Sequence, residues 1–171
     1  SEFGRLDLVV ANAGITLHCD FLEYEPSDFD RLLAVNLRGS FFLAQQAAKE
    51  LMIPAKYGRV ILIGSVTCVA GYAGLAPYGA SRGGVKQMAM ALADDWGVHG
   101  ITVNVLAPGW FKTAQNAVMY QDEEWVDYLS DRIPLKRPGA MPDLDGPLLF
   151  LASEESRYVT AQTLLVDGGI S

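Results

Sequence analysis

Three residues, Ser65, Tyr78 and Arg82, have side chains and a spacing suited to proton transfer at a substrate oxygen. Tyr78 and Arg82 are four residues apart, so on a helix they share one face, where a guanidinium stabilises a phenolate. A tyrosine with such a neighbour can act as a general acid or base. The Ser65 hydroxyl can hold the same oxygen. It is not a hydrolase nucleophile, because the surrounding sequence lacks the Gly-x-Ser-x-Gly motif.

Four short apolar runs rich in Val, Ile and Leu indicate the strands that position these residues. The runs do not alternate between polar and apolar residues, which is typical of parallel strands buried on both faces, and helical patterns lie between them. We therefore expect a single α/β domain over residues 1–171, with a doubly wound parallel sheet in three layers. The predicted strands are Leu6 to Ala11, Arg59 to Ile63, Ile101 to Leu106 and Gln162 to Val166.

Three of these strands end in sequences that suit a ligand site, namely Asn12-Ala13-Gly14, Gly64-Ser65 and Pro108-Gly109. In an open parallel sheet, ligands bind beyond the carboxyl ends of the strands. We expect the Ser65 hydroxyl at that edge of the sheet. Gly14 and Gly109 are expected to let a flat ligand approach the backbone.

The first helix is expected to begin at Pro26-Ser27, with Ser27 as its N-cap and Asp30 three residues later, as in a capping box. Asn36 lies beside the apolar stripe of this helix, so its amide should face the core and need partners. A structural role, in which Asn36 satisfies backbone groups, is as compatible with this position as a part in catalysis.

Two more helices are expected. The first runs from Tyr78 to Trp96, and its small-residue face, which includes Ala89, allows another backbone to approach closely. The second begins at Pro142 or Asp143 and ends near residue 153, and Gly146-Pro147 is expected to kink it.

Between Pro108-Gly109 and Met141 we expect an irregular stretch of the kind that forms a binding loop or lid. Its acidic run Asp122-Glu123-Glu124 is predicted to be a solvated loop or a helix start. The aromatic residues of this stretch are expected either to cover a substrate or to contact another subunit: Trp110, Phe111, Trp125 and Tyr128.

Composition excludes several function classes. The 171 residues carry 13 Lys and Arg against 20 Asp and Glu, a net charge of −7, which argues against a nucleic-acid partner. Two cysteines without Cys-x-x-Cys spacing and two histidines offer no metal site, and indicate free thiols and a cytoplasmic location. No apolar run is long enough to span a membrane, and no signal peptide is recognisable.

His18 and Cys19 follow the first strand, where a substrate could enter, but such residues are usually structural.

Taken together, the motifs resemble the short-chain dehydrogenase/reductase family, over essentially the whole chain. The resemblance implies a Rossmann-like fold and hydride transfer between NAD or NADP and an alcohol or carbonyl substrate. The matching motifs are Asn12-Ala13-Gly14 after a strand, Asn36 in the next helix, Ser65, Tyr78 with Ser81-Arg82, Pro108-Gly109 with Thr113, and the closing Val166-Asp167-Gly168-Gly169.

The resemblance also implies a role for each site residue. Tyr78 would exchange a proton with the substrate oxygen, and Ser65 would orient and polarise that oxygen. Asn36 would hold a water in a proton relay, Arg82 would bind the nicotinamide ribose, and Thr113 would contact the nicotinamide end of the cofactor. The residues implied to contact the cofactor are Asn12, Ala13, Gly14, Tyr78, Arg82, Pro108, Gly109 and Thr113.

Three departures from the family pattern bear on this interpretation. Arg82 stands where the family usually has Lys, which keeps the charge but cannot readily give up a proton. Ala11 replaces the first Asn of the usual Asn-Asn-Ala-Gly. The Gly-rich phosphate turn and the first βαβαβ half of the fold are absent from these residues, so the chain corresponds to the C-terminal part of the fold, and its first strand would be an exposed edge.

Alternatives remain at this point. The chain is either an oxidoreductase or a truncated, non-catalytic fragment or pseudoenzyme that keeps only the scaffold and the oligomer surfaces. The stretch from Gly109 to Thr113 looks most like the branch that oxidises sugar acids, such as gluconate 5-dehydrogenases, with 3-oxoacyl thioesters as an alternative substrate class. The family implies a homodimer or homotetramer, joined through the helix from Tyr78 to Trp96 and through the last helix and strand. The choice between NAD and NADP stays open, because the selecting residue would lie in the absent half.

Overall fold

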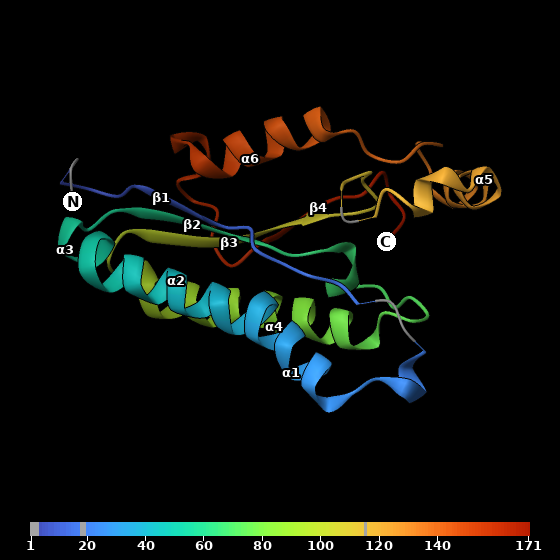
Figure 1. Cartoon of the computed structure of the whole chain (residues 1–171). Helices are drawn as coiled ribbons and strands as arrows, with labels where there is room; N and C mark the ends of the chain where they lie inside the picture. The colour runs from blue at the N-terminus through green and yellow to red at the C-terminus, as the bar shows by residue number, and fades with distance from the viewer. Residues whose placement is uncertain (1–3, 18–19, 115) are drawn as a thin grey trace.

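The computed structural model describes residues 4–17, 20–114 and 116–171, and its centre is a four-stranded parallel sheet (Figure 1). The strands lie in the order β1-β2-β3-β4. Because all four run in the same direction, their carboxyl ends meet at one edge of the sheet. This confirms the predicted α/β class with a parallel sheet. The strands are β1 (Leu8–Ala11), β2 (Gly58–Ile63), β3 (Ile101–Pro108) and β4 (Thr163–Val166).

The observed strands differ slightly in length from the predicted ones. β1 begins at Leu8 rather than Leu6, in register with Arg59 of β2. β3 continues to Pro108, which lies opposite Val166, the last residue of β4. Proline lacks an N–H but still has a carbonyl, so the end of a strand tolerates it.

Helices cover both faces of the sheet. In Figure 1, α1, α2 and α4 lie on one face and α6 on the other, giving the three expected layers. The helices are α1 (Pro26–Leu33), α2 (Ser40–Ala47), α3 (Ile53–Ala55), α4 (Ala76–Gly97), α5 (Glu123–Arg132) and α6 (Asp145–Ala152). Wider π-type turns at Ala34–Gly39 and Ala48–Met52 join α1, α2 and α3, and short 3-10 turns lie at Phe21–Glu23, Val66–Cys68, Met119–Gln121, Met141–Leu144 and Glu154–Ser156. No helix in the described ranges is long and apolar enough to cross a membrane.

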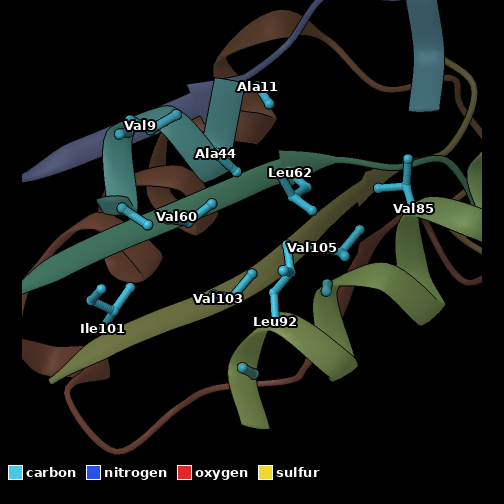
Figure 2. Packing of buried hydrophobic residues seen from close by; sticks show 14 of the residues in the cluster. Val9, Ala11, Ala44, Val60, Leu62, Val85, Leu92, Ile101, Val103 and Val105 are labelled. Carbon is cyan, nitrogen blue, oxygen red and sulfur yellow. The ribbon is translucent and has the colours of Figure 1, made fainter. Parts of the chain in front are cut away.

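Alternate residues of the central strands pack into two separate apolar layers. Val60 and Leu62 of β2 face the layer that contains Val85 of α4 (Figure 2). Ile61, which lies between them, packs instead with Leu151 of α6. Burial on both faces explains why the strands are continuously apolar.

Two details of the helix predictions are wrong. Ser27 is not the N-cap of α1, because the helix begins at Pro26 and its N-cap, Glu25, makes no capping hydrogen bond through its side chain. Proline at the first helical position has the required φ and no N–H to satisfy. Gly146-Pro147 is not an interior breaker, because α6 begins at Asp145 and both residues lie in its first turn.

The stretch from Trp110 to Met141 is less irregular than predicted, because it contains α5. The acidic run begins this helix, and the Asp122 side chain accepts a hydrogen bond from the Trp125 N–H at 3.1 Å. Carboxylates suit a helix N-terminus, where the backbone N–H groups are free. Ala89, expected on an intersubunit face of α4, is instead 1% exposed and packs in the core.

Replacing Leu62 by Ala tests the importance of the larger apolar layer. Leu62 is fully buried, so the Leu62→Ala protein should lose about 2–5 kcal/mol of unfolding free energy, measured by urea titration. Leu22→Ala is the control, because Leu22 is 76% exposed and its loss should change the free energy by less than about 0.5 kcal/mol. Equal effects of the two substitutions would contradict the proposed packing.

Candidate active site

The carboxyl ends of β1, β2 and β3, together with the first turns of α4, line one cleft, which we call the strand-end cleft. It brings together most of the site residues predicted from the sequence: Asn12, Gly14, Ser65, Tyr78, Arg82, Pro108, Gly109 and Thr113. Two predicted residues, Ala13 and Asn36, are not among those that line it. His18 and Cys19 lie outside the described residues.

Ser65 directly follows the end of β2 and caps the short turn at Val66–Cys68. Its backbone is extended, and its Oγ accepts a hydrogen bond from the Thr67 N–H at 3.2 Å. The preceding residue, Gly64, donates its N–H to the Leu106 carbonyl of β3 at 2.8 Å. The Ser65 hydroxyl is therefore held at the sheet edge by the pairing of the strands and by the turn.

Tyr78 and Arg82 lie on consecutive turns at the start of α4. Arg82 Cζ is 5.1 Å from the centroid of the Tyr78 ring, and its Nη1 donates to the Ile63 carbonyl at 2.8 Å. The Arg82 residue is only 4% exposed, and no ion pair among the described residues includes it. The helical spacing thus places a buried, unneutralised cation beside the phenol, as the sequence predicts.

The two glycines at this edge are required by the packing of the protein itself. A Cβ at Gly14 would overlap Nη2 of Arg82, so this glycine makes room for the guanidinium. A Cβ at Gly109 would lie 2.7 Å from the Asp167 Cα, so this glycine allows the chain after β4 to pack against the end of β3. In both places protein atoms occupy the space that a Cβ would need, and both glycines also line the strand-end cleft, so the prediction that a ligand approaches the backbone there stays a prediction.

Asn36 lies in the π-type turn at Ala34–Gly39 and is completely buried. Its Oδ1 accepts from the Ile15 N–H at 2.8 Å, and its Nδ2 donates to the Ile15 carbonyl at 2.9 Å and to Ser81 Oγ at 3.1 Å. Ser81 Oγ donates in turn to the Tyr78 carbonyl at 2.7 Å. The amide thereby links the chain after β1 to the turn of α4 that carries Tyr78, in agreement with the structural alternative for Asn36.

Cys68 provides a second link within the site. Its Sγ donates to the Arg82 carbonyl at 3.1 Å and lies 3.5 Å from the Ser65 nitrogen, which donates to it. Burial raises the pKa of the Cys68 thiol, so the thiol remains a hydrogen-bond donor at neutral pH. The sequence analysis missed this residue, because a lone cysteine has no distinctive spacing.

A second cleft shares Ser65, Tyr78, Gly109 and Asn116 with the strand-end cleft. Its other lining residues are Thr16, Val66, Thr67, Leu75, Trp110 and Met119. The reactive hydroxyls of Ser65 and Tyr78 therefore belong to residues that border both clefts. Such an arrangement allows one ligand on each side of the same pair of side chains.

Asn116 is a further site residue that the sequence analysis missed. Its Oδ1 accepts from the Thr113 N–H at 2.7 Å and from Thr113 Oγ1 at 3.1 Å, and its Nδ2 donates to the Phe111 carbonyl at 2.8 Å. These bonds shape the loop that carries Thr113. An Asn three residues after Thr113, in a segment following Pro-Gly, is a local turn signal that could have identified it.

Three aromatic residues of the 110–128 segment, Trp110, Tyr120 and Trp125, form a continuous cluster with Tyr72. Trp110 packs edge to face against Tyr72 and Trp125, with ring centroids 5.7 Å and 5.5 Å away. Tyr120 packs against Trp125 at 5.2 Å, and burial raises the pKa of Tyr120 to about 12. A phenol with so high a pKa is poorly suited to proton transfer near neutral pH.

Comparison with known proteins identifies the family. A family model described as enoyl-(acyl carrier protein) reductase matches residues 1–171. The chain is 39% identical over 170 residues to gluconate 5-dehydrogenase of Gluconobacter oxydans, covering 99% of the chain and 66% of that protein. It is 38% identical over 169 residues to 2-dehydro-3-deoxy-D-gluconate 5-dehydrogenase of Escherichia coli, covering 99% of the chain and 67% of that protein.

A solved structure has the same architecture. The gluconate 5-dehydrogenase of Burkholderia cenocepacia, crystallised with NADP and tartrate, superposes with a TM-score of 0.94 at 39% identity, over 97% of this chain and 65% of that one. The chain thus spans about two thirds of the length of the relatives that it matches. Its fold, its motifs and the match over its whole length establish that the chain belongs to the short-chain dehydrogenase/reductase family, of which it represents the C-terminal portion.

Proposed function

We propose that the protein transfers a hydride between NADP or NAD and a hydroxyl or carbonyl group of a sugar acid. The observation that carries this proposal is the position of Tyr78 beside the buried cation of Arg82, with Ser65, at the border of two clefts. The names of the relatives, which are dehydrogenases of gluconate and of a deoxygluconate, support the substrate class.

The strand-end cleft suits the nicotinamide end of the cofactor. Buried Arg82 lines this cleft and makes one hydrogen bond through Nη1, so the guanidinium N–H groups that face the cleft can donate to a ligand with acceptor oxygens. Ribose hydroxyls and the nicotinamide amide have such oxygens. NADP or NAD, when bound, accepts or supplies the hydride. Of the cofactor residues expected from the sequence, Ala13 does not line this cleft, and those proposed to hold the cofactor are the ones that do: Asn12, Gly14, Tyr78, Arg82, Pro108, Gly109 and Thr113.

Proton transfer is assigned to Tyr78. In the oxidative direction, the substrate hydroxyl gives its proton to the Tyr78 oxygen, and the reverse reaction returns it. The positive charge of Arg82 stabilises the phenolate form of Tyr78, which is the form that accepts this proton. Ser65 holds the substrate oxygen, and it keeps its O–H available because its Oγ accepts, rather than donates, the bond from Thr67. Asn36 positions α4 through Ser81.

We also propose a homo-oligomer, because large apolar side chains are exposed on the outer helices. Phe42 and Leu43 of α2 and Met90 of α4 lie on one side of the sheet, and Leu149 and Phe150 of α6 lie on the other. Exposed apolar patches of this kind commonly mark protein interfaces.

The Tyr78→Phe variant tests the proposed proton transfer. Loss of the phenol oxygen should lower kcat by on the order of 10²- to 10⁴-fold in gluconate oxidation by the full-length gene product. NADPH binding, followed by nicotinamide fluorescence, should stay within about twofold, because the ring remains. Tyr158→Phe is the matched control, since Tyr158 is fully exposed. An unchanged kcat would exclude Tyr78 as the acid or base, and no turnover by the wild-type protein would overturn the proposed function.

The contact between Gly14 and Arg82 generates a second prediction. Gly14→Ala should lower kcat/KM by about tenfold or more, because its Cβ would displace the guanidinium. In an Arg82→Lys background the same change should cost less, since lysine has no Nη2 atom. The double-mutant cycle in kcat/KM measures this coupling. Gly83→Ala is the control, because no described atom beyond its chain neighbours and its own helix backbone lies within 4 Å of the position of an added Cβ. Purely additive losses would contradict the contact.

The proposed assembly predicts the effect of a charge on the outer face of α4. Met90 is 42% exposed, so Met90→Glu should leave the fold intact but shift the sedimentation coefficient of the full-length gene product toward that of a smaller species. Gln87→Glu, at another exposed position of the same helix, is the control. Unchanged sedimentation of the Met90 variant would place the interface elsewhere.

A further inference from the structure

We propose that Arg132 binds the carboxylate of the substrate, at the far end of an aromatic passage that begins at Ser65 and Tyr78. This inference rests on the proposed function and adds the residue that distinguishes an acidic substrate from a neutral one. Nothing in the sequence pattern singled out Arg132.

The passage consists of two clefts with common walls. The second cleft, next to the reactive hydroxyls, shares Leu75, Trp110 and Met119 with a third, which we call the aromatic cleft. The aromatic cleft continues along Tyr72, Trp125, Tyr128 and Arg132. A chain-like ligand with one end at Tyr78 could therefore extend past Trp110 toward Arg132.

The charge of the residues that line the passage indicates which kind of chemical group would bind in it. Among the described residues that line these two clefts, Arg132 has the one permanently charged side chain. Its Nη1 donates to the Tyr128 hydroxyl at 2.6 Å, and its Cζ lies 5.6 Å from the centroid of that ring. These contacts hold the guanidinium without neutralising it.

Two ion pairs close to Arg132 in the sequence do not include it. Asp131 pairs with Lys136 at 3.6 Å, and Arg137 pairs with Asp143 at 2.6 Å. No ion pair between described residues includes Arg132. A guanidinium of this kind, with parallel N–H groups and no carboxylate of its own, suits a carboxylate ligand.

The walls of the passage suit a polyhydroxylated chain. The rings of Tyr72, Trp110 and Trp125 present apolar surface for C–H groups. In the second cleft, the Oγ1 atoms of Thr16 and Thr67 are buried and have no hydrogen-bond partner among the described residues. We propose these two hydroxyls as candidates to pair with the hydroxyl groups of such a ligand.

The separation between Arg132 and Tyr78 has a chemical consequence. The residues around Ser65 and Tyr78 in the second cleft are uncharged, so the carboxylate and the oxidised hydroxyl bind at different places. The passage therefore fits an acid whose reacting carbon lies several bonds from its carboxylate. It does not favour a 2-hydroxy acid, in which the two groups are adjacent.

The test compares two six-carbon ligands that differ at one end, D-gluconate and the neutral D-glucitol. In the full-length gene product, Arg132→Gln should raise the KM for gluconate by about tenfold or more and leave kcat within about twofold, because a charge-assisted bond away from the reacting carbon is lost. The kinetic constants for glucitol should not change. Arg132→Lys should recover part of the affinity. Arg157→Gln, which removes an exposed arginine outside the passage, is the matched control.

Binding without turnover provides an independent readout. Trp110 and Trp125 border the passage, so gluconate should change the tryptophan fluorescence of the wild-type protein, at concentrations that have no effect on Arg132→Gln. If the wild-type protein oxidises both compounds and Arg132→Gln affects them equally or not at all, the assignment of Arg132 is wrong while the proposed function stands. If the wild-type protein oxidises neither compound but Arg132-dependent gluconate binding persists, the proposed function fails and the carboxylate site stands.

Discussion

The arrangement of this site depends on a single buried cation. Arg82 is almost fully removed from solvent, and the Ile63 carbonyl at the end of β2 accepts from its Nη1. Burying a charge costs free energy unless hydrogen bonds compensate for it. Here the compensation is partial, since Nε has no partner and no carboxylate of the described residues pairs with the guanidinium. A site built in this way gains from an anionic or acceptor-rich group at its surface, such as a phenolate or a cofactor hydroxyl.

Much of the surrounding structure keeps this cation and the reactive hydroxyls in place. Gly14 leaves the volume that Nη2 occupies. Asn36 connects the chain after β1 to α4 through Ser81, and Cys68 connects the Ser65 turn to the backbone of Arg82. The side chains of Asn36 and Cys68 form their hydrogen bonds with other protein groups, so these residues contribute by positioning the reactive side chains. The π-type turn that carries Asn36 is of a kind often found at functional sites.

Two clefts border Ser65 and Tyr78, and in the proposed function one receives the cofactor and the other the substrate. The strand-end cleft has the Arg82 cation and the glycines of the strand ends, whereas the second cleft has threonine and aromatic walls. The proposed hydride transfer needs its two reactants in contact at one place and held apart elsewhere, and two clefts with a common border suit this requirement. The aromatic cluster of Tyr72, Trp110 and Trp125 then extends the substrate side toward Arg132.

The sequence by itself determined the parallel α/β class, the strand positions to within about two residues, and the meeting of Ser65, Tyr78 and Arg82 at one sheet edge. Local signals suffice for these features, because helical spacing and continuous apolar runs reflect contacts close in the chain or common to all parallel sheets. Tertiary structure decided the rest. Packing between distant segments places Gly14 beside Arg82 and supplies the hydrogen-bond partners of Asn36. It also places Arg132 in the same cleft as Trp110. No local pattern specifies such contacts, because they arise only when separate elements pack.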